Sequence, residues 1–267
     1  MPRAKPLKNT LREKRAGPFR VIEKSYTADH SLARHEHESA YVSFLLAGAY
    51  LEVSRQDERN CSPGTVIWHP RTEAHADRFH SCGGHLLDLE IDADWLGDAQ
   101  QEFKLVPQAR MFQGGLPYLL GLRVYRELSG DSCAVEGAAI ELLSFFFAGP
   151  FDRQRPAWFD RALRICSEDH DQALSLAAVA LALGVHPVHV ARSFRRFMGC
   201  TFGDHLAAIR IRKAFELLRN SKMPIVEVAY ACGFADHAHL CRTLKKSTGL
   251  TPSAFRARIQ TGFQTPR

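Results

Sequence analysis

The 267-residue sequence predicts an α+β protein built from two parts. The N-terminal part is expected to be a β-sandwich or barrel with supporting helices, and the C-terminal part an all-α domain with two helix-turn-helix units. Short runs of β-formers separated by turns fill residues 19–91, and helical apolar spacing begins after residue 95. One helical pattern also occurs twice in the C-terminal third. The boundaries are placed at residues 1–20, 21–150 and 156–262.

The strands are predicted from β-formers that stand beside turn residues. Ala47-Gly48 lies between two such runs and predicts a hairpin, and Pro63-Gly64 marks a further turn. Short strands at such spacing are typical of a sandwich or a barrel. We expect strands at residues 41–46, 50–53, 65–68 and 85–91.

Helices are predicted where apolar residues recur at helical spacing. Gly149-Pro150 ends the last helix of the N-terminal part, and the polar stretch 152–156 marks the boundary. Ser175 and Asp236 are expected to be helix N-caps. The expected helices are 116–128, 135–147, 157–169, 176–183, 187–198, 203–219, 225–232, 236–247 and 253–260.

Charge is shared unevenly between the two parts. Residues 156–267 carry 16 Lys and Arg against 8 Asp and Glu, whereas residues 21–155 carry 12 against 20. The C-terminal part therefore suits a polyanion such as DNA, and the N-terminal part does not. Residues 1–20 hold seven Lys or Arg and one acid, and we expect a flexible basic arm there. Such an arm either touches DNA phosphates or is a solvated tail.

The cysteines and the apolar segments indicate the cellular compartment in which the protein works. The seven cysteines are scattered, odd in number and without a Cys-x-x-Cys pair, which argues against a disulfide framework or a zinc ribbon. No apolar run approaches the length of a membrane span, and the N-terminus lacks the pattern of a secretory signal. We expect a cytoplasmic protein without a membrane partner.

The repeated pattern in the C-terminal part points to its chemistry. Ala180 stands four residues before Gly184 in the first copy, and Ala229 stands four residues before Gly233 in the second. The small Ala lets two helices cross closely, and Gly supplies the tight turn between them. Two such helix-turn-helix units in tandem predict DNA binding.

The second helix of each unit is expected to lie in the major groove, with its outward side chains at base edges. Arg reads guanine best, His can bond a base acceptor, and Lys suits phosphates. On a single helix such residues would equally suit a solvated face, but two homologous helices favour DNA. The predicted contacts are Val188, His189, Ala191, Arg192, Arg195, Arg196, His237, Ala238, His239, Cys241, Arg242, Lys245 and Lys246.

A longer motif surrounds the second unit. It consists of Pro224, Ile225, Val228, Ala229, Cys232, Gly233, Phe234, Leu240, Leu244, Lys245, Gly249, Thr251, Pro252, Phe255 and Arg256. With this motif, residues 156–260 resemble the DNA-binding domain of the AraC/XylS transcription regulators, which usually carry Phe where Leu244 stands. The resemblance implies a rigid helix around residues 209–218. That helix would set both recognition helices into successive major grooves, about 34 Å apart.

One departure from the family limits the first unit. Val188 and Ala191 stand at outward positions where relatives often have larger or polar side chains. Readout by this unit is therefore expected to depend mainly on Arg192, helped by His189 and by apolar contact with thymine methyl groups.

The N-terminal part carries two spaced histidine motifs. The first has His35, His37, Tyr41 and Gly48, and the second has Gly64, Pro70, Thr72 and His75. Their spacing resembles that of the cupin barrel, the usual sensor domain of many AraC/XylS regulators, although Tyr41 replaces a Glu and Thr72 a Gly. The resemblance implies a cupin-like sensor and dimerisation domain at residues 21–150.

The histidines allow two interpretations. His35 and His37 share one face of a strand, and with His75 they could hold a divalent metal (Zn, Fe or Ni) with an open position. Alternatively, they only line a pocket, which the loss of the carboxylate favours. A pocket that binds a small molecule needs apolar walls and a few polar anchors. Our candidates for it are Tyr41, Phe44, Trp68, His75 and Phe79.

The whole pattern predicts a transcription regulator, not an enzyme, that binds double-stranded promoter DNA and responds to a small-molecule effector. The resemblance implies a homodimer supported by helices at residues 114–148, and contact with RNA polymerase if the protein is an activator. Two other classes stay open. One is a metal-dependent cupin enzyme, an oxygenase or isomerase, fused to a DNA-binding domain. The other is an architectural DNA binder without a ligand.

Overall fold

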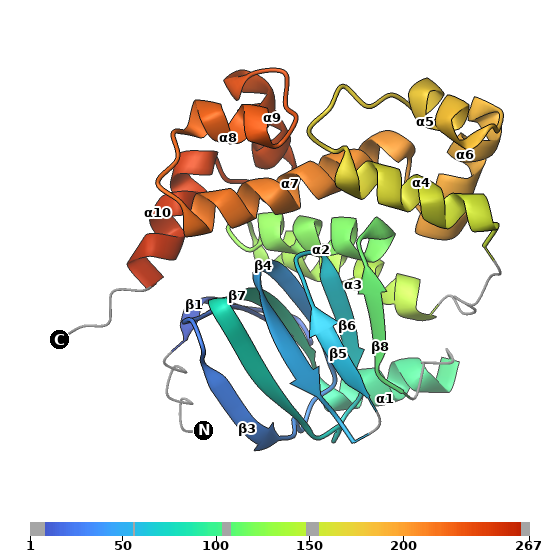
Figure 1. Ribbon diagram of the computed structural model, residues 1–267. Helices are drawn as coiled ribbons and strands as arrows, with labels where there is room; N and C mark the ends of the chain where they lie inside the picture. The colour runs from blue at the N-terminus through green and yellow to red at the C-terminus, as the bar shows by residue number, and fades with distance from the viewer. Residues whose placement is uncertain (1–8, 56, 103–107, 148–154, 263–267) are drawn as a thin grey trace.

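The computed structural model describes residues 9–55, 57–102, 108–147 and 155–262. It is an α+β structure with an antiparallel sheet in the N-terminal part and helices in the C-terminal part (Figure 1). The sheet has the strand order β1-β2-β7-β4-β6-β8, with β3 paired to β7 and β5 paired to β4. The strands are β1 (Thr10–Ala16), β2 (Phe19–Tyr26), β3 (Ser31–His35), β4 (Tyr41–Val53), β5 (Glu58–Cys61), β6 (Thr65–His69), β7 (His75–Ile91) and β8 (Arg110–Gln113).

Two long strands, β4 and β7, pair along the centre of the sheet. Along its other edge, each long strand pairs with two shorter strands in succession. These are β6 and β5 for β4, and β2 and β3 for β7. The pairing of β4 with β7 also shifts register twice, and such irregularities bend a sheet. Among the described strands, β1 and β8 do not pair with each other, so the sheet is open.

The hairpin predicted at Ala47-Gly48 is wrong, because residues 41–53 form the single strand β4. Gly48 has a φ of 93°, and a Cβ there would lie 2.0 Å from the carbonyl oxygen of Gly83 on β7. The glycine therefore allows two strand backbones to approach closely at an irregular register. It does not make a turn.

The flexible arm expected at residues 1–20 is also corrected. Residues 10–16 form β1 and pair with β2, and Ala16 and Phe19 are buried in the core. Within this segment Arg12 forms an ion pair with the buried Glu23, while Arg15 stays exposed. Residues 1–8 lie outside the described residues.

Helices cover one face of the sheet. They are α2 (Gly115–Glu127) and α3 (Ser132–Phe147), close to the predicted bounds, while α1 (Ala93–Glu102) follows β7 directly. Side chains of that face, such as Phe44 and Trp68, pack with both helices in one apolar cluster. Because successive residues of a strand point to opposite faces, their sequence neighbours Ser43 and His69 lie on the other face.

The C-terminal helices match the predicted ranges closely. They are α4 (Ala157–Glu168), α5 (Leu176–Leu183), α6 (Pro187–Ser193), a π-helical turn at Phe194–Met198, α7 (Phe202–Asn220), α8 (Ile225–Ala231), α9 (His237–Thr248) and α10 (Pro252–Gly262). Both predicted N-caps are confirmed: the side chain of Ser175 accepts from the amide of Ala178, and that of Asp236 accepts from the amide of His239. Among the described helices none alone is long and apolar enough to span a membrane. The bent pair of Leu176–Leu183 and Pro187–Met198, joined at 105°, passes that criterion by length and composition.

The two helix-turn-helix units differ in how they pack. The second unit (α8 and α9), with the C-terminal half of α7 and α10, shares one apolar cluster with the sheet, α2 and α3. The first unit (α5 and α6), with α4, the π-helical turn and the N-terminal half of α7, forms a separate apolar cluster. The second unit thus shares buried core residues with the N-terminal part, whereas the first unit meets that part through the partly buried Leu119 of α2.

Candidate nucleic-acid interface

The first recognition helix, α6 with the π-helical turn, buries the side predicted to face inward. Val190 and Phe194 are fully buried, and Phe194 packs edge-on against Phe159 of α4. On the other side of the helix, Val188, His189, Arg192 and Arg195 are exposed, and Ala191 is half-buried. The N-terminus of α6 is capped by His186, whose ring accepts from the amide of Val188.

The second recognition helix, α9, repeats this arrangement. Leu240 and Leu244 are buried in the apolar cluster. The predicted outward residues His237, Ala238, Arg242, Lys245 and Lys246 are all exposed. Half-buried Cys241 lies 3.5 Å from the ring of His237, so these two side chains contact each other one helical turn apart.

His239 departs from its predicted orientation. Its ring accepts from the backbone amide of Ala235 and packs edge-on against Phe234, and the side chain is half-buried. It stabilises the turn between α8 and α9. The sequence placed it outward because helical spacing alone does not show a side chain that folds back onto its own turn.

The turns of both units have the expected geometry. Ala180 and Ala229 are buried where the two helices cross, and Gly184 and Gly233 have φ values of 68° and 75°. Such left-handed conformations favour glycine. At Gly233 a Cβ would also lie 2.3 Å from the carbonyl oxygen of His170, so the second turn touches the loop after α4.

The recognition helices present cationic groups without acidic partners. Within the described ranges, Arg192 and Arg195 of the first unit and Arg242, Lys245 and Lys246 of the second have no ion pair within 4.0 Å. The two units lie towards opposite ends of α7 (Figure 1), and α9 also packs against α2. The arrangement leaves both cationic faces accessible to a polyanion.

Arg196 is placed differently from the other predicted contacts. Its guanidinium lies 5.3 Å from the ring of Phe197, and it lines a cavity between the first unit and the N-terminal part. Arg196 lies within the π-helical turn, where the helix departs from regular α-helical geometry. A regular helix was assumed in the prediction, so this departure was not visible in the sequence.

The predicted pocket residues fall on two faces of the sheet. Tyr41, His75 and Phe79 lie on the face away from α2 and α3, where Phe79 stacks on Tyr26. Phe44 and Trp68 do not line that face, because they are buried against α2 and α3 with 0% and 2% of their surface exposed. Strand alternation explains the error: Tyr41 and Phe44 are three residues apart and must point to opposite faces.

The predicted histidine cluster does come together at one end of the sheet. The ring of His75 lies 4.5 Å from that of His35 and 5.5 Å from that of His37. Burial lowers the pKa of His37 to about 4, and burial together with neighbouring histidines lowers that of His75 to about 3. Both lowered pKa values keep these rings neutral near neutral pH. In His75 both ring nitrogens already have polar contacts, Nδ1 with the carbonyl oxygen of Glu73 and Nε2 with the hydroxyl of Tyr41, each at 3.1 Å.

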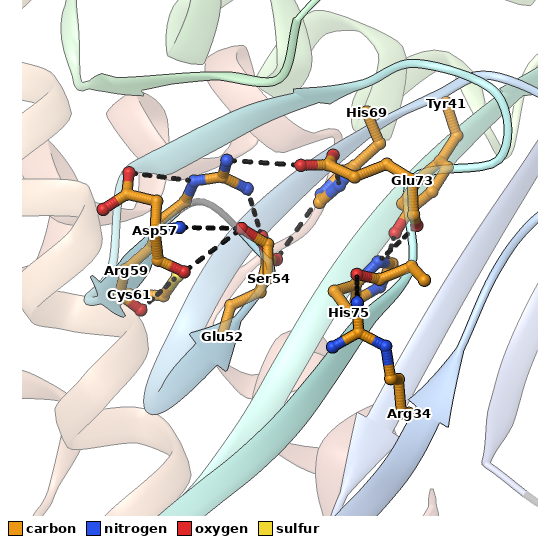
Figure 2. Close-up of polar contacts among 11 residues, drawn as sticks. Arg34, Tyr41, Glu52, Ser54, Asp57, Arg59, Cys61, His69, Glu73 and His75 are labelled. Carbon is orange, nitrogen blue, oxygen red and sulfur yellow. Dashed lines mark hydrogen bonds and ion pairs between the residues drawn. The ribbon is translucent and has the colours of Figure 1, made fainter.

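Sequence reasoning missed two members of this cluster, His69 and Glu52. The ring of His69 stacks on Tyr41 and lies between the carboxylates of Glu52 and Glu73, at 3.6 and 3.5 Å (Figure 2). Tyr41 in turn contacts Nε2 of His75 at 3.1 Å. One signal could have found His69. It stands two residues after Ile67 on β6, so both side chains point to the face away from α2 and α3, opposite to Trp68.

Two sets of side chains have metal-ligand spacing, and they fit a metal unequally. The nitrogens of His35, His37 and His75 lie within 4.8 Å of one another, and this set has three imidazoles without a carboxylate. The second set is Glu52, His69 and His75, but Glu52 is already bound to Arg59 at 2.6 Å. Because Oε1 of Glu52 already accepts from Arg59, the three-histidine set is the better candidate of the two for a divalent ion.

Comparison with known proteins assigns the C-terminal part. Residues 179–258 match the model of a helix-turn-helix domain family. Over 88 residues the chain is 39% identical to the HTH-type transcriptional regulator GlxA of Rhizobium meliloti, which covers 33% of this chain and 27% of that protein. It is 30% identical over 86 residues to the probable transcription factor PqrA of Proteus vulgaris, covering 32% of this chain and 70% of that protein. The C-terminal domain of the response regulator AraT from Geobacillus stearothermophilus is 30% identical, with a TM-score of 0.38, over 39% of this chain and 88% of that domain.

The chain belongs to the AraC/XylS family of transcription regulators. The recognised part of this AraC/XylS protein is its C-terminal third, and the match to GlxA spans about a quarter of that relative. All the predicted DNA contacts of the AraC/XylS domain lie within or beside the matched residues 179–258.

Proposed function

We propose that this AraC/XylS protein is a sequence-specific transcription regulator that places α6 and α9 in two successive major grooves of one promoter duplex. The observation that supports this most is the pair of exposed, cationic and unpaired helix faces, attached to the two ends of α7. Residues 156–262 would form the DNA-binding domain and residues 21–150 the sensor and dimerisation domain. The two grooves require a separation of about 34 Å between recognition helices.

Readout would divide between base contacts and phosphate contacts. Arg192 and Arg242 stand near the middle of their helices and suit guanine edges, while Lys245 and Lys246 suit phosphates. Val188, with 46% of its surface exposed, is able to contact a thymine methyl group. His239 would support the turn of the second unit and would not read a base.

The N-terminal part would respond to a small-molecule effector through a population shift. A ligand that prefers one arrangement of the sheet and the recognition helices changes promoter affinity by its differential binding. A cupin-like sensor is consistent with the antiparallel sheet and with the inward positions of Tyr41, His75 and Phe79. A divalent ion on His35, His37 and His75 stays a proposal, which metal analysis of untagged protein tests.

A homodimer, with RNA polymerase as a further partner of an activator, completes the proposal. Of the two helices expected to support the dimer, α2 is covered by α7 and α9, so the outer face of α3 around exposed Ile140 is the favoured contact. The relatives named above are regulators, so the comparisons do not favour the metal-dependent enzyme.

Base readout by the second unit is tested with Arg242→Ala. We expect this variant to lose about 1–3 kcal/mol of binding to its promoter site, mostly as discrimination at one base pair. The measurement is a mobility-shift titration, repeated at several salt concentrations. It compares random DNA with the promoter site that footprinting of the parent protein identifies. Arg164→Ala, which removes an exposed arginine of α4 outside both recognition helices, is the matched control. An equal loss on both DNAs would show that Arg242 contacts only phosphate, as an architectural binder requires.

A further inference from the structure

Each helix-turn-helix unit packs on α7 through a different set of apolar side chains. Phe202, Leu206 and Ile209 of α7 belong to the apolar cluster of the first unit. Ile211 and Phe215 of the same helix belong to the cluster that holds the second unit. The two clusters share no buried side chain among the described residues. The placement of α6 relative to α9 therefore depends on how each unit sits on α7 and on any contact that bridges the units.

The loop between α4 and α5 (residues 169–175, the α4–α5 loop) is such a bridge. It leads directly into the first unit, and Leu174 packs against the apolar cluster of that unit. In Figure 1 the loop arches between the two units. It also lies against the turn of the second unit. A Cβ on Gly233 would be 2.3 Å from the carbonyl oxygen of His170 and 2.7 Å from Cα of Asp171. A side chain at position 233 would therefore push the loop away.

Arg210 of α7 holds this loop by its backbone. Its Nε donates to the carbonyl oxygen of His170 at 2.8 Å, and its Nη2 donates to that of Gln172 at 2.9 Å. The planar guanidinium presents its donors in a fixed geometry, whereas lysine carries one ammonium group on a flexible stem. Along α7, Arg210 stands between Ile209 of the first cluster and Ile211 of the second. One side chain near the middle of α7 thus fixes the loop that touches both units.

The surroundings of Arg210 favour this pair of hydrogen bonds. The guanidinium is half-buried, and burial lowers its pKa, while the charge of nearby Asp171 acts in the opposite direction. A charged group that loses part of its hydration needs hydrogen-bond partners in the protein. The two carbonyl groups follow the C-terminal end of α4, where helix carbonyls attract a cation. The loop backbone therefore supplies partners that suit this arginine.

We propose that Arg210 is a positioning residue for DNA reading. By holding the α4–α5 loop against the turn at Gly233, it sets the placement of α6 relative to α9. It thereby sets the number of base pairs between the two grooves that the protein accepts. This inference rests on the proposed function, since it requires that one chain reads two grooves of one duplex.

Pre-organisation explains why such a contact affects DNA binding. Two linked readers bind most tightly when the linkage already holds them at the separation of their sites. If the loop is released, the first unit samples more orientations on α7. The effective concentration of the second reader at its groove then falls, and sites with other spacings become less unfavourable. Loss of Arg210 should therefore weaken binding and relax the spacing requirement together.

A second arginine makes a similar bond within one unit only. Arg256 of α10 donates to the carbonyl oxygen of Met223, just before α8, at 2.6 Å. Met223 packs against the apolar cluster of the second unit, so this bond does not reach the first unit. Its loss should lower the stability of the second unit without releasing one unit from the other. Arg256→Met is therefore the matched control for Arg210→Met.

The spacing requirement is measured with DNA and the full chain. A site selected from random duplexes is compared with the same site carrying one extra base pair between the two grooves that footprinting identifies. The insertion moves the second groove by about 3.4 Å and turns it by about 35°. We expect the parent to prefer the original site about tenfold, and Arg210→Met to reduce that preference about threefold. Arg256→Met should keep it. An unchanged preference in Arg210→Met would overturn the proposal.

Hydrogen exchange of the free protein tests the same contact without DNA. The amides of Gln172 and Leu174 donate within the α4–α5 loop, and the amide of Gly233 donates within the turn of the second unit. Arg210→Met should increase exchange at all three amides, whereas Arg256→Met should leave the two loop amides as in the parent. Unchanged exchange in a folded Arg210→Met protein would show that other contacts hold the loop, and the proposal would fail.

A second variant covers a failure of the first to fold. If circular dichroism shows that Arg210→Met is unfolded, Arg210→Lys replaces it, because lysine keeps the charge without the fixed pair of donors. Its preference and its exchange should change in the same directions by smaller amounts, and parent-like values of both would refute the role of Arg210. If the parent itself binds both sites equally, two-groove binding fails, and with it the effect on spacing. Exchange still decides whether Arg210 holds the loop.

Discussion

The two helix-turn-helix units have the same local design but different attachments. In both, an Ala is buried at the helix crossing, a Gly with positive φ makes the turn, and a polar side chain caps a helix. The second unit is continuous with the core of the N-terminal part, whereas the first forms its own apolar cluster and borders a charged cavity. The difference shows that a repeated sequence determines each unit, while its neighbours determine how firmly it is held.

The second unit is attached to the N-terminal part through α10 and α9. Phe255 of α10 stacks on Phe215 of α7 at 4.1 Å and lies 5.5 Å from His85 of β7. Arg126 of α2 donates to the carbonyl of Lys246 at the end of α9. We therefore expect α9 to be held more firmly than α6.

The largest expected effect comes from removing one core aromatic ring from each cluster. Phe255→Ala and Phe159→Ala each delete a ring with 0% exposure, at a cost of about 3–5 kcal/mol in unfolding free energy. Phe255→Ala should reduce hydrogen-exchange protection in the sheet and in α9 together. Phe159→Ala should reduce protection in α5 and α6 and leave β4 protected. Equal loss of protection in β4 for both variants would show that the units are attached alike.

An effect of intermediate size is expected from acid. Although burial alone raises the pKa of Glu23, the hydrogen bond and charge of His85 and the charge of Arg12 lower it to about 2. Tyr125 of α2 also donates to this carboxylate, and Arg258 of α10 lies 4.0 Å away. A lowered pKa in the folded state stabilises the fold above the ordinary value of 4.5. This stability should be lost as the pH falls from about 4.5 towards 2.

The measurement is urea unfolding as a function of pH, with Glu23→Gln as the comparison. The variant should be less stable than the parent at neutral pH and should lose less stability below pH 4.5. Hydrogen exchange should place the acid-labile protection in β2, α2 and α10, around the second unit. If the unfolding free energy of the variant fell with pH below 4.5 as steeply as that of the parent, Glu23 would not be the source of the acid sensitivity.

The smallest expected effect comes from the helix caps. Asp236→Ala removes the N-cap of α9, and Ser175→Ala removes that of α5, each at a cost of about 0.5–2 kcal/mol. Because α9 is held by the shared core, Asp236→Ala should leave DNA affinity nearly unchanged. Ser175→Ala should weaken DNA binding more, since the first unit has fewer other contacts. Binding titrations on the promoter site compare the two, and a larger effect of Asp236→Ala would reverse our ranking of the units.

Local patterns sufficed for the helices and for most strand segments, but they misplaced one turn of the sheet. Helical spacing and the caps Ser175 and Asp236 predicted the C-terminal elements closely, because each depends on residues three or four positions apart. Gly48 was mistaken for a turn residue, because its reason lies in Gly83, which is distant in sequence. For the same reason no spacing pattern revealed that Glu52 and His69 join His75.

The sequence by itself determined the duplicated units, their turns and the cationic side of each recognition helix, since these follow from neighbours along one helix. Only the tertiary structure decided that the second unit shares the core of the N-terminal part and that the first borders a cavity. It also decided that Arg196 lines that cavity, unlike the other predicted DNA contacts. The physical reason is that burial and charge compensation depend on side chains brought together by the fold, which are far apart along the chain.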